Sequence, residues 1–143
     1  MTTIAWDGQT LAGDCQCSLF RGQNVKIHRL PSGSLYGGSG EVGALYAVKD
    51  WLTAHGEGEK PKCSEHFHAI VIDKYGKVFA LEDNLIFMPI TDRPFFAVGS
   101  GREFAMAAMF LGQTAENAVK IAHEFDTGTG REVDILKLEG VIL

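Results

Sequence analysis

The sequence predicts an α+β fold in which two stacked antiparallel sheets lie between layers of helices, a four-layer αββα sandwich. Strand-like segments occupy both halves of the chain, one helix-like segment separates two groups of them, and two more helix-like segments precede a last strand. Helices placed between groups of strands can cover both outer faces of a pair of sheets. The strand count also allows a simpler two-layer α+β fold, which is the alternative.

The chain begins with a predicted β-hairpin formed by residues 2–6 and 10–16. Asp7-Gly8 joins the two segments, and this dipeptide favours the positive φ angles of a tight turn. A strand is expected next at 25–30, where Lys26 and His28 share one face because side chains alternate along a strand. A further strand is expected at 34–37.

A helix is predicted over residues 40–55, with Ser39 as its N-cap and Gly56 as its stop. Its apolar positions recur at helical spacing, and they are Val42, Ala44, Leu45, Val48, Trp51 and Leu52. The run Gly56-Glu57-Gly58-Glu59-Lys60-Pro61 that follows is polar and broken by glycine and proline. Such a run cannot continue a helix or begin another, so a loop is expected there.

The second half is expected to contain strands at 66–73, 77–81, 84–88 and 95–98, then two helices, then a strand at 132–138. The first helix covers 101–111 and is rich in alanine and methionine. The second covers 115–125 behind the N-cap Thr114. Its inward positions are expected to be Ala118, Ile121, Ala122 and Phe125.

Composition indicates one domain covering residues 1–143, since 143 residues that are 45% hydrophobic can form one adequate core. A formal charge of −5 argues against a nucleic-acid partner, which requires a basic face. No apolar run approaches the length of a membrane span, and no secretion signal precedes the first strand. Three cysteines are an odd number, which favours a reducing, cytoplasmic location.

Thr2 and Thr3 directly follow Met1 and indicate a candidate nucleophile. A threonine at a mature N-terminus supplies a hydroxyl that attacks and an α-amine that accepts the proton. That amine titrates at roughly pH 7.7–8.0, close to neutrality. Removal of Met1 is expected, because threonine is small enough for a methionine aminopeptidase. A retained Met1 would turn the amine into an amide, which cannot accept a proton.

Six short segments in order resemble the proteasome β-subunit family of N-terminal-nucleophile hydrolases, most closely its bacterial HslV branch. They are Thr2-Thr3-Ile4 with Ala12-Gly13-Asp14, Lys26-Ile27-His28-Arg29-Leu30, Tyr36-Gly37-Gly38-Ser39-Gly40-Glu41, Val98-Gly99-Ser100-Gly101, and Asp126-Thr127-Gly128-Thr129-Gly130. The resemblance covers nearly the whole chain. It implies the αββα fold already predicted, with one helix shortened or missing where residues 56–61 form a loop.

The resemblance also implies a threonine endopeptidase without a cofactor or metal. Thr2 would be the nucleophile, Lys26 would stabilise its alkoxide, and Asp14 would hold Lys26. Gly37 would donate its backbone N–H to the oxyanion. The residues that would position the terminal amine and its water are Ser100, Asp126 and Thr129.

The partners implied by the resemblance are unfolded polypeptide, further copies of the chain in a ring, and an ATP-dependent unfoldase. No nucleic-acid or membrane partner is expected.

Because a helix is missing, Val42, Leu45 and Trp51 would lack part of their cover. We therefore expect the helix at 40–55 to lie at or near a subunit contact, covered by the loop that follows or by another subunit. A catalytically silent ring or scaffold subunit is the alternative function.

A metal site is the second alternative. Cys15-Gln16-Cys17 and Cys63-Ser64-Glu65-His66-Phe67-His68 provide five soft or borderline ligands. The spacing of these residues matches no common zinc pattern. His66 and His68 would share one face and could equally face solvent beside Glu82.

Overall fold

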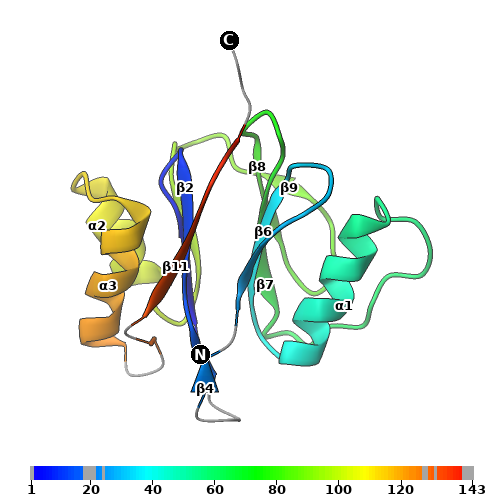
Figure 1. The fold of residues 1–143 in the computed structure, drawn as a ribbon, viewed down its shortest axis with the longest axis horizontal. Helices are drawn as coiled ribbons and strands as arrows, with labels where there is room; N and C mark the ends of the chain where they lie inside the picture. The colour runs from blue at the N-terminus through cyan, green and yellow to red at the C-terminus, as the bar shows by residue number, and fades with distance from the viewer. Residues whose placement is uncertain (1, 18–21, 24, 127–128, 131, 140–143) are drawn as a thin grey trace.

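The computed structural model describes residues 2–17, 22–23, 25–126, 129–130 and 132–139 (Figure 1). Two antiparallel sheets stack face to face. The first has the order β10-β1-β2-β11 and consists of β1 (Thr3–Trp6), β2 (Thr10–Asp14), β10 (Phe96–Gly99) and β11 (Val133–Lys137). The second has the order β5-β6-β7-β8-β9 and consists of β5 (Ile27–Arg29), β6 (Leu35–Ser39), β7 (His68–Ile72), β8 (Val78–Leu81) and β9 (Met88–Pro89). A two-stranded extension pairs β3 (Gln16–Cys17) with β4 (Gly22–Gln23).

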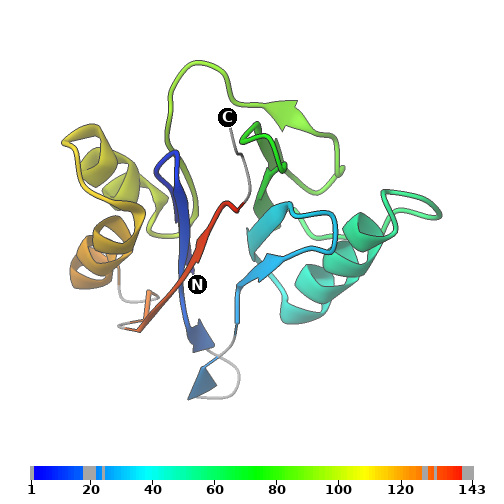
Figure 2. The same cartoon turned by 45° about the horizontal axis from the view of Figure 1, so that its top comes forward.

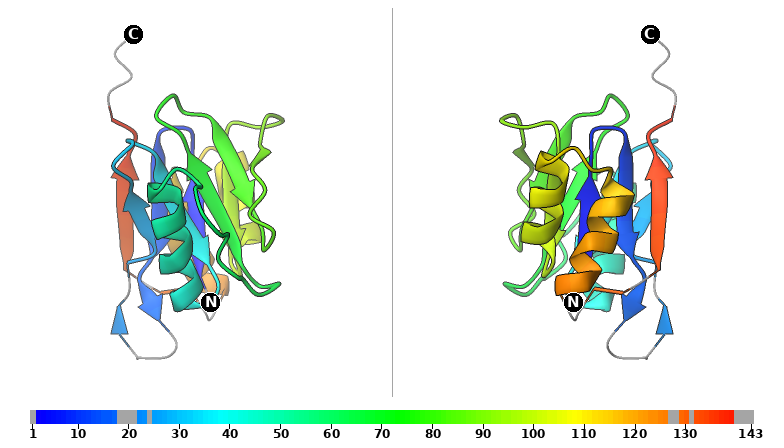
Figure 3. Two further views of the ribbon diagram at one scale, coloured as in Figure 1. Left: turned by 90° about the vertical axis from the view of Figure 1, so that its right-hand side faces the viewer. Right: turned by 90° about the vertical axis from the view of Figure 1, so that its left-hand side faces the viewer.

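Helices cover both outer faces of the paired sheets (Figures 1 and 2). Helices α2 (Arg102–Phe110) and α3 (Ala115–Phe125) pack on the first sheet, and α1 (Val42–Thr53) packs on the second. The side views in Figure 3 show the same order of layers. The predicted α+β sandwich with αββα layers is confirmed, and the simpler two-layer alternative is wrong.

Strand alternation divides the first sheet into a bulky inner face and a small outer face. The inner face meets the second sheet in a buried cluster formed by Ile4, Trp6, Leu11, Ile27, Leu35, Ile70, Ile72 and Val98. The outer face presents Ala5, Ala12 and Ala97 to α2 and α3. Small side chains let helices lie close to a sheet, and buried alanines of α2 and α3 complete that contact.

Helix α1 forms the whole helical layer over the second sheet among the described residues, because residues 54–67 contain no helix. The predicted loop is therefore confirmed. Of the three side chains expected to need cover from the following loop or from another subunit, Leu45 and Trp51 are each 8% exposed and are therefore covered within the chain, and Val42 is half-buried. Phe67 and Leu85 pack in the same cluster. The connections that follow α1 and β8 thus replace the missing helix as cover.

Three local expectations are corrected. The strand expected at 84–88 is reduced to β9, because Leu85 adopts a φ of 55° in a turn and donates its N–H to Glu82. The N-cap of α1 is Glu41 rather than Ser39, which stays paired with His68 in the sheet.

The third correction concerns the inward face of α3. Phe125 is 67% exposed and stacks on Phe104 at the surface. Val119 is buried in its place. The predicted cap is confirmed, because the Thr114 side chain accepts a hydrogen bond from the N–H of Asn117. None of the helices described here is long and apolar enough to span a membrane.

Candidate active site

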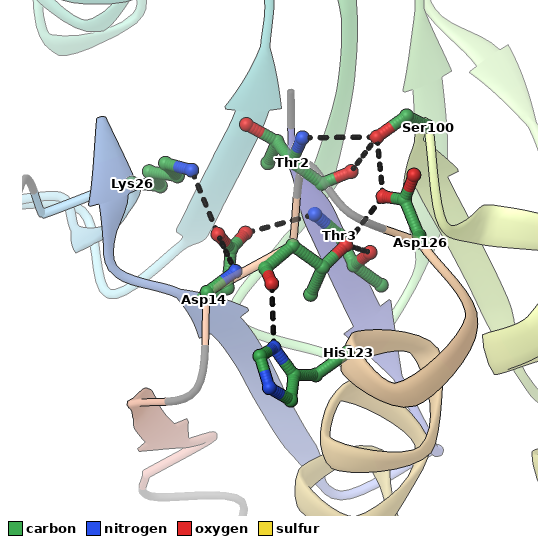
Figure 4. A network of polar contacts seen from close by, with 9 residues as sticks. Thr2, Thr3, Asp14, Lys26, Ser100, His123 and Asp126 are labelled. Atoms are coloured by element: carbon green, nitrogen blue, oxygen red, sulfur yellow. Dashed lines mark hydrogen bonds and ion pairs between the residues drawn. The ribbon is translucent and has the colours of Figure 1, made fainter. Parts of the chain in front are cut away.

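The predicted site residues Thr2, Asp14, Lys26, Ser100 and Asp126 come together in one polar network (Figure 4). The network lies at the end of the sandwich where the chain begins (Figure 1). Strand β1 begins there, β2 and β10 end there, and the connection from α3 to β11 passes beside them. The elements come from both ends of the chain. The antiparallel register fixes their proximity, because Thr3 is aligned with Gly99 and Ile4 with Gly13.

Asp14 is the hub of this site and is completely buried. Its Oδ1 accepts a hydrogen bond from the N–H of Thr3 at 2.8 Å. Its Oδ2 accepts from the N–H of Gly130 at 2.9 Å and from Lys26 Nζ at 3.0 Å. A buried carboxylate is stable only when such donors compensate for its lost hydration. Lys26 is 6% exposed, so it is a buried partner of Asp14 rather than a solvated strand lysine.

Ser100 lies on the other side of Thr2. The backbone nitrogen of Thr2 donates to Ser100 Oγ at 3.2 Å, and Ser100 Oγ donates to Asp126 Oδ2 at 2.6 Å. A hydroxyl has one hydrogen, so Ser100 gives it to Asp126 and accepts from Thr2. Figure 4 shows the Thr2 hydroxyl on the side of the residue that faces Lys26, and its nitrogen on the side of Ser100. Thr2 therefore lies between a charged pair and a hydroxyl–carboxylate pair.

Thr3 and Thr129 continue the network. Thr129 Oγ1 donates to Asp126 Oδ2 at 2.6 Å, and Thr3 Oγ1 lies 2.6 Å from Thr129 Oγ1. Since Thr129 uses its hydrogen on Asp126, Thr3 is the donor in the second contact. Asp126 thus fixes the two threonines and Ser100 together.

Thr3 and His123 belong to the network but are not predicted as site residues from the sequence. His123 Nδ1 lies 2.7 Å from the carbonyl oxygen of Thr129. A carbonyl only accepts, so Nδ1 carries a hydrogen in this contact. His123 stands one helical turn before Asp126, and this spacing is the only signal that could have indicated it.

The glycines on both sides of Ser100 permit this close approach. A Cβ on Gly99 would lie 2.1 Å from the carbonyl oxygen of Thr2, and Gly99 has a φ of +101°. A Cβ on Gly101 would lie 2.0 Å from Thr3 Oγ1. A side chain at either position would therefore displace the N-terminal segment from Ser100.

Gly37 lies in the middle of β6, aligned with Ile27 on one side and Ile70 on the other. The N–H of the next residue, Gly38, donates to the carbonyl of Lys26 at 3.3 Å. N–H directions alternate along a strand, so the N–H of Gly37 points toward β7 and its ladder. This direction does not favour the expected role of Gly37 as an oxyanion donor, which stays a prediction.

Packing accounts for Gly37 instead, and this gives a test. A Cβ there would lie 2.8 Å from Ile4 Cγ2 and 2.9 Å from Ile27 Cγ2, between the two sheets. We expect Gly37→Ala to lower the free energy of unfolding by about 1–3 kcal/mol through overpacking. Urea unfolding measures this, with Gly43→Ala as the control because a Cβ at Gly43 meets no atom within 4 Å. Full stability of Gly37→Ala with lost turnover would instead support the oxyanion role.

In the described part of the chain, no group of three or more His, Cys, Asp or Glu side chains is placed to hold a metal ion, so the metal-site alternative has no support there. Burial, together with a hydrogen bond to Asp134, raises the pKa of the Cys15 thiol to about 11. Burial also raises the pKa of Cys63. Raised values disfavour the thiolates that bind zinc. The side chain of Cys17 lies outside the described residues.

No family model matches the sequence, and a search of curated proteins finds no similar sequence. Solved structures are similar over almost the whole chain. Eukaryotic HslV from Trypanosoma brucei has a TM-score of 0.70 at 16% identity, covering 97% of this chain and 99% of that chain. BPH from Thiobacillus denitrificans in complex with epoxomicin has a TM-score of 0.67 at 19% identity, with the same coverage.

A third structure agrees with these two. The Anbu (Gly-1) mutant from Hyphomicrobium sp. strain MC1 has a TM-score of 0.68 at 15% identity, covering 97% of this chain and 82% of that chain. At such identities the similarity establishes the fold. The chain therefore has the α+β fold of the proteasome β-like N-terminal-nucleophile hydrolases HslV, BPH and Anbu.

Proposed function

We propose that the protein is a threonine-type peptidase whose nucleophile is the hydroxyl of Thr2, exposed by removal of Met1. The observation that carries the proposal is the arrangement around Thr2. A buried Lys26–Asp14 pair lies on its hydroxyl side, and a Ser100–Asp126 pair binds its nitrogen. Nucleophilic catalysis requires a nucleophile, a proton acceptor and fixed charge near the developing alkoxide.

Acylation uses the amine of Thr2 as the base. The hydroxyl oxygen attacks the scissile carbonyl carbon, and its proton passes to the amine. The tetrahedral intermediate then collapses, the C–N bond breaks, and the amine returns the proton to the leaving nitrogen. An ester to Thr2 remains. Water hydrolyses it by the same route, since the amine takes a proton from water and returns it to the threonine oxygen.

The surrounding groups prepare this amine and hydroxyl. Ser100 accepts one amine hydrogen because its own hydrogen is directed at Asp126. That contact fixes the amine and leaves its lone pair for the hydroxyl proton. The ammonium of Lys26 stabilises negative charge on the Thr2 oxygen, and Asp14 holds the ammonium in place.

The test begins with the N-terminus. We expect intact-mass spectrometry of the purified protein to show loss of Met1, and the processed protein to hydrolyse fluorogenic peptide amides. Epoxomicin, the ligand in the BPH complex, is expected to bind processed protein and raise its thermal midpoint. A form that retains Met1, made by inserting a residue that blocks the aminopeptidase, is the control. Equal turnover by both forms would contradict the proposal.

Assembly is part of the proposal. We expect a homo-oligomeric ring that receives unfolded polypeptide from an ATP-dependent unfoldase. Exposed apolar side chains support an interface, including Phe104 and Phe125 on α2 and α3 and Phe110 at 77% exposure. Size-exclusion chromatography with light scattering measures the mass. A monomer of 15.6 kDa at micromolar concentration would contradict the ring.

A further inference from the structure

A pocket of about 240 Å³ lies between β10 of the first sheet and β7 and β8 of the second. The apolar residues that line it are Ala69, Ala80, Leu81, Phe96, Ala97 and Val98. Polar groups line it as well, and they are His68, Glu82 and Arg102. The volume leaves room for one aliphatic or aromatic side chain.

The pocket adjoins Thr2 through β10 and the start of α2. Val98 lines it and directly precedes Gly99, which is aligned with Thr3. Arg102 lines it and donates from Nη1 to the carbonyl of Gly99 at 3.2 Å. Ser100, which binds the nitrogen of Thr2, lies between these two lining residues in the chain. The pocket is therefore on the amine side of Thr2.

The reaction determines which half of the substrate lies on the amine side of Thr2. The leaving nitrogen of the substrate receives its proton from the Thr2 amine, so it must lie on the amine side. The Thr2 hydroxyl lies on the opposite side, toward Lys26 (Figure 4). The acyl half of a peptide thus extends past Lys26, and the half that leaves extends past Ser100 toward Arg102.

We propose that this pocket binds the side chain of the substrate residue that directly follows the scissile bond, and that it selects an apolar residue. The proposal rests on the proposed peptidase function and adds a specificity to it. The side chains of Ala80, Phe96 and Val98 face the space between the sheets, and they favour an aliphatic or aromatic side chain by burying it. Glu82 and Arg102 carry opposite charges, so neither sign of substrate charge is favoured.

The test compares two kinds of substrate on processed protein. A peptidyl coumarin amide has no residue after the scissile bond, whereas an internally quenched peptide has one. We expect kcat/KM for quenched peptides to be about tenfold or more higher with Leu or Phe at that position than with Gly or Asp. This measurement needs no variant and is independent of how substitutions affect folding.

Filling the pocket gives a second readout. Ala80→Met adds volume at a position aligned with Ile70. We expect it to lower the ratio of Leu-peptide to coumarin-amide turnover about tenfold, and to reduce the preference for Leu over Gly. Ala108→Met is the matched control, because Ala108 is 6% exposed on the buried face of α2 and does not line the pocket. The control should keep the wild-type ratio.

The outcomes separate the two proposals. Absence of coumarin-amide turnover after verified loss of Met1 would contradict the peptidase function and the pocket with it. Turnover of the coumarin amide with no preference among Leu, Phe, Gly and Asp would contradict the pocket alone. A preference for a charged residue would also overturn it.

Discussion

Thr2→Ala is expected to abolish peptide cleavage, with a fall in kcat/KM of about 10⁴-fold or more, because it removes the attacking oxygen. The fold should remain, since alanine keeps the backbone N–H that donates to Ser100. Coumarin-amide hydrolysis measures the first effect. Urea unfolding measures the second, which we expect to stay within about 1 kcal/mol of the wild type.

Two controls make this result specific. Thr2→Ser retains the oxygen and should keep part of the activity. Thr10→Ala removes a threonine at the other end of the same hairpin and should change nothing in turnover. Thr2→Ala with wild-type turnover would mean that Thr2 is not the nucleophile, whatever the state of Met1.

The Lys26–Asp14 contact illustrates what the sequence could predict. Asp14 ends strand β2 and Lys26 directly precedes strand β5, and the two side chains meet at one end of the sandwich. Ser100 and Asp126 similarly follow a strand and a helix whose bounds could be estimated from their periodicity. Residues at the ends of regular elements were therefore placed well.

Gly37 shows what the sequence could not provide. Two adjacent glycines before a helix fit an oxyanion donor and a packing contact equally well. Only the register of β6 against β5 and β7 decides which way the N–H points. Register depends on tertiary pairing, so no local pattern contains it.

Contacts between distant polar side chains were missed for a related reason. Thr3 and Thr129 are 126 residues apart, and their hydroxyls meet because α3 packs on the sheet that contains β1. Phe125 was placed inward by helical periodicity, yet the α3 face that packs on the sheet is narrow and consists mostly of alanine. The surplus aromatic ring lies outside, against Phe104.

Loss of the Lys26–Asp14 pair is the second large effect expected. Lys26→Met should abolish turnover, because no cation then stabilises the Thr2 alkoxide. It should also lower the free energy of unfolding by up to about 3–5 kcal/mol, since it removes the cation from a fully buried carboxylate. The N–H groups of Thr3 and Gly130 still donate to Asp14 and will reduce that loss.

Asp14→Asn preserves the shape of the side chain, but it replaces one of the two accepting oxygens of Asp14 with an NH₂ group, which donates. At least one of Thr3 N–H, Gly130 N–H and Lys26 Nζ then loses its acceptor. We expect turnover to fall by orders of magnitude, because the orientation of Lys26 depends on this carboxylate.

The double variant Asp14→Asn/Lys26→Met separates a coupled pair from two independent residues. Once either partner is lost, the other can no longer act through it, so the second substitution should add little to the first. A double-mutant cycle in unfolding free energy should give a coupling of about 1–3 kcal/mol, and kcat/KM of the double variant should be close to that of the less active single variant. Asp73→Asn/Lys77→Met is a matched control, because these residues lie on an exposed turn far from Thr2 and Asp73 accepts only backbone N–H groups in its observed hydrogen bonds. Additive losses at Asp14 and Lys26 would mean that their ion pair does not act as one unit in the folded protein.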